Sequence, residues 1–230
     1  MPNEPPTELR TNAGDVSLHQ YHVTLGGRAY AILHTGAILT VADEQRLVSD
    51  NERQRPYGLA LWPSAIALAH EIAGRADETR GRHILELGAG TGLPGIVAAS
   101  LGARVVQTDR HPAALSLCRL NAERNGATTV EHRLGDWVLW DDATRYDRII
   151  GSDVLYAAAM HAYLSDIFNA NLAPGGRVLL SDPFRRASLA LLESLETAGW
   201  RVTFGKWSVG GEDARCAVGV YELSRADEPR

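Results

Sequence analysis

The sequence predicts an α/β protein with a doubly wound, mostly parallel sheet. From residue 82 onward, short apolar runs alternate with longer segments of helical periodicity, the order that successive βαβ units produce. Glycines cluster where the first of these apolar runs ends, which is typical of a strand that turns into a helix. The last two apolar runs, 200–209 and 216–223, are too close together for a helical crossover. They must therefore pair antiparallel, so the parallel sheet ends in an antiparallel strand.

The N-terminal part of the chain is predicted to be an appendage to this sheet. Residues 1–15 are polar and proline-rich and are expected to form a disordered tail. Two strand-like runs within residues 16–35 are joined by the turn signal Gly26-Gly27, which predicts a β-hairpin. Residues 36–56 have mixed polarity and are expected to connect the hairpin, as a solvated loop or short helix, to a main domain at 57–225.

The main domain is predicted to begin with a helix within residues 57–74. Pro63 lies in its first turn, where the missing N–H costs nothing, and Gly74 is suited to its end. We expect this helix to lie over the ligand crevice. The elements that follow are strands at 83–87, 105–108, 129–134, 146–152 and 177–181, which alternate with helices at 93–101, 112–125, 159–172 and 187–198; with the terminal pair these make seven strands.

Composition narrows the classes of function. A chain of 230 residues that is 45% apolar is large enough for one globular domain with a substantial core. A net charge of −5 gives no general field for nucleic acid. The two cysteines have neither metal spacing nor a disulfide framework, and His70-Glu71 lacks the second histidine of a zinc helix, so no metal site is predicted. The absence of a signal-peptide-like or membrane-length apolar run predicts a cytoplasmic protein that does not enter membranes.

The segment Glu86-Leu-Gly-Ala-Gly-Thr-Gly92 carries the functional prediction. Glycine permits positive φ and lets the backbone approach a ligand without an intervening Cβ, so Gly88, Gly90 and Gly92 favour a nucleotide-like ligand. Asp109 ends the next strand about 20 residues after Gly88, where a carboxylate can accept both hydroxyls of a ribose. This pattern alone leaves a dinucleotide enzyme open.

Two further segments narrow the choice. The glycine segment resembles motif I of the class I, seven-strand methyltransferases that use S-adenosylmethionine (SAM), which have a Rossmann-like fold. Leu61-Trp-Pro-Ser-Ala65 and Ser152-Asp-Val-Leu-Tyr156 are similar to the protein-lysine methyltransferases that modify elongation factors, chaperones and the electron-transfer flavoprotein. The likeness covers about residues 57–185. It implies SAM as cofactor, S-adenosylhomocysteine (SAH) as product and a protein substrate.

The resemblance also implies roles for residues on the cofactor side. The three glycines would lie under the methionine and ribose parts of SAM. Glu86 would reach the cofactor's ammonium directly or through water, or would only order the loop. Asp109 would hold the ribose. Arg110 would lie over the adenine, unless it is a solvated arginine.

Four more residues complete the expected cofactor site. The resemblance implies that Asp136 accepts a hydrogen bond from the adenine amino group and that Trp137 flanks the ring, unless Trp137 is part of the core. Trp62 would contact the methionine end of SAM, or would anchor the hairpin. Ser152, at the end of the fourth core strand, is also expected to belong to the cofactor site.

On the acceptor side, the resemblance implies that Asp153 and Tyr156 face the channel of the methyl acceptor. Methyl transfer from a sulfonium is an in-line displacement, so the enzyme mainly aims a neutral nucleophile. A lysine amine, with an ordinary pKa of about 10.4, must first lose a proton, and an aromatic channel favours that loss. Asp153 would accept a hydrogen bond from the amine, and Tyr156 would form the wall and hold a methylated ammonium over its ring. The alternative for Asp153 is the N-cap of the next helix.

Other functions stay open. The same frame suits a small-molecule N- or O-methyltransferase or an inactive SAM-binding scaffold. An NAD(P)-dependent reductase is disfavoured because Lys206 is the only lysine and no tyrosine precedes it by four positions. An RNA methyltransferase is disfavoured because the fourth strand does not end in an Asn/Asp-Pro-Pro-aromatic signature. The sequence leaves the acceptor, the number of methyl groups and the oligomeric state open.

Overall fold

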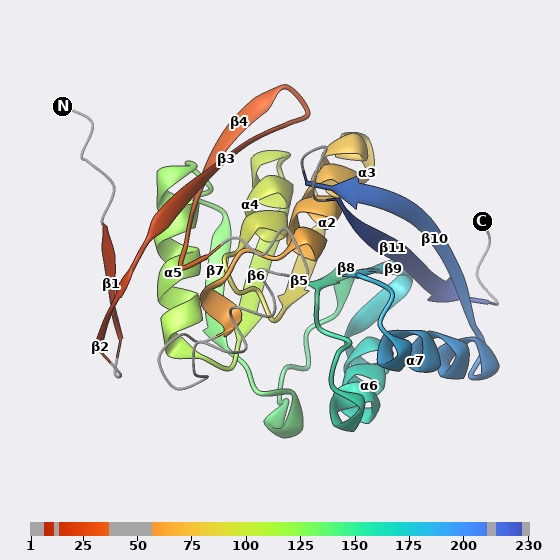
Figure 1. Ribbon diagram of the computed structural model, residues 1–230. Helices are drawn as coiled ribbons and strands as arrows, with labels where there is room; N and C mark the ends of the chain where they lie inside the picture. The colour runs from red at the N-terminus through yellow and green to blue at the C-terminus, as the bar shows by residue number, and fades with distance from the viewer. Residues whose placement is uncertain (1–6, 12–13, 37–56, 211–214, 227–230) are drawn as a thin grey trace.

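The centre of the protein is a seven-stranded sheet (Figure 1). The computed structural model describes residues 7–11, 14–36, 57–210 and 215–226. The strands lie in the order β10-β11-β9-β8-β5-β6-β7. Neighbours from β9 to β7 are parallel, whereas β11 is antiparallel to both β9 and β10. The predicted fold is therefore confirmed. The strands are β5 (His83–Leu87), β6 (Arg104–Asp109), β7 (Val130–Leu134), β8 (Tyr146–Ser152), β9 (Leu172–Asp182), β10 (Trp200–Val209) and β11 (Cys216–Arg225).

Helices cover both faces of the sheet, because the strands are apolar on both sides. Helices α2 (Pro63–Gly74) and α4 (Leu93–Ser100) share a buried cluster with one face, which includes Ile84 and Val105. Helices α6 (His161–Asn171) and α7 (Arg186–Thr197) share a second cluster with the other face. Helix α5 (Pro112–Arg124) packs beside α4 (Figure 1). A short helix α3 (Ala76–Thr79) and the 3-10 turns η1 (Tyr57–Leu59), η2 (Trp137–Leu139) and η3 (Ala158–Met160) complete the described elements.

The N-terminal region forms two small sheets. Strand β3 (His19–Leu25) pairs antiparallel with β4 (Arg28–His34), which confirms the hairpin, and its Gly26 and Gly27 have φ of 55° and 80°. The expectation of a disordered tail up to Asp15 is wrong for the described part, because β1 (Glu8–Thr11) pairs with β2 (Gly14–Ser17). The physical reason is that Leu9 is buried, in a cluster that includes Leu33 and Leu59. Most of the predicted connecting segment lies outside the described residues.

One predicted boundary differs from the structure. The Pro-Gly-Gly sequence at 174–176 was expected to end the preceding helix ahead of a strand at 177–181. The helix ends at Asn171, and β9 begins at Leu172. The pairing with β8 shifts register between Tyr146, opposite Leu172, and Arg148, opposite Arg177, so the Pro-Gly-Gly lies in an irregular stretch of a longer strand. None of the described helices is long and apolar enough to span a membrane.

Candidate functional site

The candidate site lies at the carboxyl ends of the central parallel strands. Strand β5 has β6 on one side and β8 on the other, so the order of the sheet reverses here. In open α/β sheets this switch point leaves a crevice outside the strand ends, where ligands bind. The ends of β5, β6, β7 and β8 and the segments that follow them carry the predicted site residues, except Trp62, which precedes α2.

The glycine segment forms a tight cradle between β5 and α4. Gly88, Gly90 and Gly92 have φ of 61°, 56° and 80°, a left-handed conformation that side chains rarely adopt. A Cβ on Gly88 would lie 3.0 Å from Cγ1 of Val154, and one on Gly90 would lie 3.0 Å from the carbonyl oxygen of Gly58. The turn can therefore take this conformation, and pack this closely against Val154 and Gly58, only because these residues are glycines. This cradle fits a nucleotide-like group such as SAM.

The Glu86 side chain lies beneath helix α4. It is 1% exposed, its Oε2 accepts a hydrogen bond from Nε2 of Gln107 at 2.6 Å, and the Gly95 backbone N–H interacts with the same carboxyl group. A Cβ on Gly95 would lie 2.3 Å from Oε2, so a glycine is needed in the helix above. Gln107 also donates to the carbonyl of Gly92 at 2.8 Å. These contacts support the role of ordering the loop, and a contact between Glu86 and the cofactor's ammonium stays a prediction.

The environment of Glu86 changes its acidity. Burial raises the pKa of its carboxyl to about 8, which the hydrogen bonds from Gln107 and Gly95 oppose and the nearby charge of Asp109 reinforces. Its Oε1 has no hydrogen-bond partner among the residues that the structure describes. A neutral carboxyl is therefore favoured below pH 8 in the protein without ligand.

The carboxylate of Asp109 links the end of β6 to the glycine cradle. It is 7% exposed, its Oδ2 accepts from the Gly90 backbone N–H at 3.2 Å, and its Oδ1 accepts from the His111 backbone N–H at 2.9 Å. Burial raises the pKa of Asp109, while these two hydrogen bonds lower it. Each oxygen can still accept another hydrogen bond, as the ribose role requires. Arg110 is exposed, and its Nε donates to the ring of His111 at 3.0 Å.

The segment after β7 brings an aromatic ring to the cradle. A Cβ on Gly88 would lie 3.5 Å from the Trp137 ring, and the half-buried Trp137 packs against the core. Trp137 therefore packs against the core close to the glycine cradle, and its role beside the adenine ring stays a prediction. Asp136 is exposed, and its Oδ1 accepts from the Val138 backbone N–H at 3.0 Å, so it caps η2.

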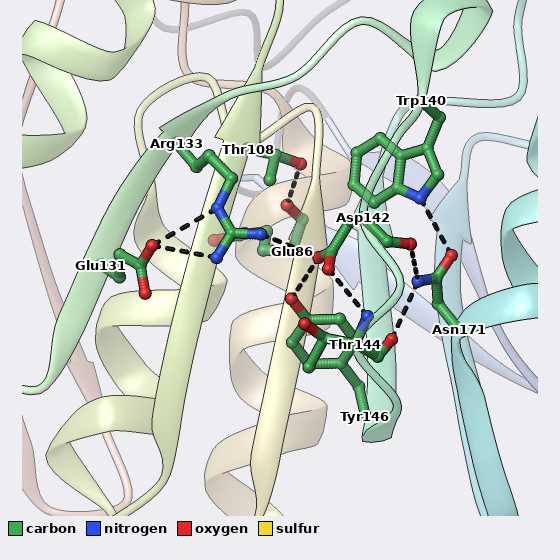
Figure 2. Close-up of polar contacts among 9 residues, drawn as sticks. All are labelled: Glu86, Thr108, Glu131, Arg133, Trp140, Asp142, Thr144, Tyr146 and Asn171. Carbon is green, nitrogen blue, oxygen red and sulfur yellow. Dashed lines mark hydrogen bonds and ion pairs between the residues drawn. The ribbon is translucent and has the colours of Figure 1, made fainter.

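A partly buried polar network holds this segment in place (Figure 2). Asp142 accepts from the Tyr146 hydroxyl at 2.5 Å and from Nη1 of Arg133 at 2.9 Å. The Asn171 amide donates to the carbonyls of Asp142 at 2.7 Å and Thr144 at 2.8 Å and accepts from Nε1 of Trp140 at 2.9 Å. The network fixes the β7–β8 connection, and thereby the residues 136 and 137 within it.

The segment before α2 covers the other side of the cradle. Trp62 is half-buried and directly precedes Pro63, the first residue of α2. In the turn before it, the Gly58 carbonyl lies against Gly90, as described above. Trp62 therefore lies four residues after Gly58, which contacts the cradle, and both predicted roles of Trp62 remain open.

The residues expected on the acceptor side lie at and just after the end of β8. Asp153 has φ of 58°, and its backbone N–H donates to the Ser181 carbonyl at 2.8 Å. Its carboxylate forms an ion pair with Arg185. Ser152 is the last residue of β8, and Tyr156 is 59% exposed. The N-cap alternative for Asp153 is wrong, because α6 begins after Met160 and lacks a side-chain cap.

Sequence reasoning missed several residues of the site: Gly95, Gln107, Asn121, Asp142, Asn171 and Arg185. Asn121 is fully buried, and its Nδ2 donates to the Thr91 carbonyl in the cradle at 2.9 Å. The signal that was available is a polar residue in an apolar element, such as Gln107 after Val105-Val106. No such signal marked Arg185.

Comparison with known proteins agrees with this geometry. A family model described as lysine methyltransferase matches residues 41–193. Protein N-lysine methyltransferase METTL21A of Xenopus tropicalis is 31% identical over 143 residues, which are 60% of this chain and 66% of that protein. Histone-arginine methyltransferase METTL23 of Mus musculus is 35% identical over 109 residues, 44% of this chain and 42% of that protein. The matched stretches thus span less than two thirds of either relative.

Solved structures share the fold. The magnesium protoporphyrin IX methyltransferase ChlM of Synechocystis, solved with bound SAM, superposes with a TM-score of 0.56 at 20% identity. The superposition covers 70% of this chain and 80% of that one. At this sequence identity the likeness shows the fold and nothing finer.

Proposed function

Because the chain belongs to the lysine methyltransferase family, we propose that it transfers a methyl group from SAM to a lysine amine of a protein. The observation that carries the proposal is the pairing, at one switch point, of a glycine cradle with two acidic residues. Asp109 lies beside the cradle, and Asp153 follows the adjacent strand β8. The SAM bound to the structural neighbour and the name of the Xenopus relative support the cofactor and the acceptor.

The chain's own residues divide the work of binding. The backbone of the cradle would approach the ligand closely, and Asp109 would accept hydrogen bonds from the ribose hydroxyls. Trp137 would lie against the adenine, and Asp136 would accept from its amino group. SAM, when bound, supplies an electrophilic methyl group on a positively charged sulfur.

The acceptor side aims the nucleophile. Asp153 accepts an N–H of the acceptor amine and fixes the direction of its lone pair. Tyr156, exposed at the rim, shields the amine from water and contacts the methylated ammonium through its ring. Proximity and orientation are the main contributions of the protein in such a transfer.

Arginine is the second candidate acceptor, because the mouse relative is named a histone-arginine methyltransferase. We place the activity in a reducing compartment, the cytoplasm, which the free thiols Cys118 and Cys216 support.

The test is incubation with tritiated SAM and a lysate of the source cells, followed by separation of proteins from metabolites. We expect a labelled protein band that yields methyllysine on acid hydrolysis. Methylarginine would favour the second acceptor, and label in the metabolite fraction would favour a small-molecule methyltransferase. Label in neither fraction would leave a SAM-binding scaffold.

A further inference from the structure

An arginine joins two carboxylates at the ends of adjacent strands. Asp153 follows β8, and Asp182 is the last residue of β9. Nη1 of Arg185 donates to Oδ2 of Asp182 at 3.0 Å and also to Asp153. The exposed fraction is 0% for the Asp182 side chain, 7% for that of Asp153 and 26% for that of Arg185. The cluster is therefore mostly shielded from water and holds two negative charges and one positive charge.

The loop that carries Arg185 is built to hold it there. The Arg185 backbone N–H donates to Oδ1 of Asp182 at 2.7 Å, so Asp182 binds both the backbone and the side chain of Arg185. Phe184 has φ of 61°, which is uncommon for a bulky residue. Its ring packs against Phe204 and Tyr221, with centroids 6.2 Å apart in each case. Packing on one side and Asp182 on the other thus fix the guanidinium next to Asp153.

The charge of Arg185 is secure. Burial alone would lower the pKa of its guanidinium, but the Asp153 and Asp182 carboxylates outweigh burial, and the net pKa is raised. The Tyr221 hydroxyl is close enough to interact with Asp182, and burial together with that carboxylate raises the pKa of Tyr221 to about 12. Tyr221 is therefore neutral at working pH.

We propose that Arg185 is a positioning residue of the acceptor site, which orients the Asp153 carboxylate and offsets part of its charge, so that the acceptor amine loses its proton at a lower pH than it would beside an unpaired carboxylate. The proposal rests on the proposed function. A buried carboxylate without a counter-charge stabilises an ammonium and so opposes the deprotonation that methyl transfer requires. A guanidinium bound to the same carboxylate repels a second cation and so weakens that effect, although the two carboxylates together keep the cluster net negative.

Two features indicate that Arg185 stays in place when the substrate binds and is not displaced by it. Arg185 is anchored to Asp182 through two bonds that do not involve Asp153. Either Asp153 oxygen has the capacity to accept an additional N–H while the guanidinium stays in place.

The experiment compares Arg185→Gln, which removes the charge, with Arg185→Lys, which keeps it. Initial rates of label transfer from tritiated SAM to heat-inactivated lysate protein are measured from pH 6.5 to 9.5. The exposed neighbour Arg186 supplies the matched control, Arg186→Gln. His161, whose ring contacts the Leu155 carbonyl at 2.9 Å, is present in every variant. Differences between the pH–rate profiles of the variants therefore report the charge at position 185. SAH affinity by calorimetry and the melting temperature report folding.

We expect the midpoint of the pH–rate profile of Arg185→Gln to move upward by about one unit, with a rate about tenfold lower at pH 7.5 that recovers above pH 9. SAH affinity should change less than about twofold. Arg185→Lys and Arg186→Gln should keep the wild-type midpoint. A purely structural role would lower the rate equally at every pH.

Three results would overturn the proposal: an unchanged midpoint in Arg185→Gln, a faster rate in that variant, or a shifted midpoint in Arg185→Lys. If Arg185→Gln fails to fold, Arg185→Met, which also removes the charge, replaces it with the same expected shift of the midpoint. Absence of labelled protein with the wild-type chain would reject the proposed function itself, and this proposal with it.

Discussion

The side-chain amide of Asn121 pairs with both backbone groups of Leu33. Its Oδ1 accepts from the Leu33 N–H at 2.7 Å, and its Nδ2 donates to the Leu33 carbonyl at 3.0 Å. One turn later, Asn125 makes the same pair of bonds with Ala31, each at 3.0 Å. Helix α5 thereby takes the place of a neighbouring strand along β4. Because Asn121 also donates to Thr91, the hairpin and the glycine cradle share one residue.

We expect Asn121→Ala to destabilise the protein by about 2–4 kcal/mol, because it leaves buried backbone groups unpaired. The same change should weaken SAH binding several-fold, because the Thr91 carbonyl loses its donor. Asn125→Ala is the matched control, since it removes the equivalent bonds to the hairpin but none to the cradle. Urea unfolding and calorimetry with SAH measure the two effects. Equal losses of SAH affinity in both variants would contradict a specific link through Asn121.

Glu86 should make stability fall as pH rises. Its pKa is about 8 in the folded protein, above the ordinary value of 4.5, so the folded state binds the proton more tightly. The stability this gives is complete below pH 4.5 and is lost as pH rises through 8. We expect the difference in unfolding free energy between the wild type and Glu86→Gln to change by up to about 1.4 kcal/mol per pH unit in this window. The measurement is urea unfolding of both proteins from pH 5 to 8. If Glu86 were ionised throughout, the two unfolding free energies would differ by the same amount at every pH.

Asp109→Asn should weaken SAH binding at least tenfold, since an amide offers one acceptor in place of two and cannot accept both ribose hydroxyls in the same way. Calorimetry with SAH is the measurement. Asp166→Asn, an exposed position on α6, serves as the control and should bind as the wild type does. Unchanged affinity in Asp109→Asn would remove the ribose assignment.

Asp142→Asn should cost about 2–3 kcal/mol at pH 7, because the Arg133 ion pair and the Tyr146 hydroxyl lose a charged acceptor. Burial raises the pKa of Asp142. The hydrogen bonds from Tyr146 and Thr144 and the charge of Arg133 lower it by more than burial raises it, so the net pKa is below 3.8. The advantage of the wild type is therefore present above that pH and is lost as pH falls through the lowered pKa. Urea unfolding at pH 7 and at pH 3 should show a gap that narrows at the lower pH; a constant gap would contradict this origin.

Asp153→Asn should abolish label transfer from tritiated SAM while SAH affinity stays within about twofold of the wild type. The reason is that we assign Asp153 to the acceptor side, and its carboxylate is bound to Arg185 rather than to the glycine cradle. Transfer that persists in the variant would exclude Asp153 as the residue that directs the amine.

The sequence by itself determined the layout of the protein. Periodicity and loop length are local properties, so they predicted the alternating strands and helices, the hairpin at Gly26-Gly27 and the antiparallel last strand. The glycine cradle and Asp109 were also predictable, because the chemistry of a strand-to-helix turn requires glycine at fixed positions.

The tertiary structure alone decided which polar groups meet. Glu86 finds Gln107 only because β5 and β6 are neighbours, and Asn121 finds Leu33 only because α5 lies along β4. Arg185 reaches Asp153 because two strands end side by side and a loop turns back between them. Each of these contacts joins residues far apart in the chain. Which polar groups meet depends on how the apolar faces of the elements pack together, and a local sequence pattern does not encode that packing. A polar group must find a partner only where the packing buries it, because an unpaired polar group is costly only when it is buried.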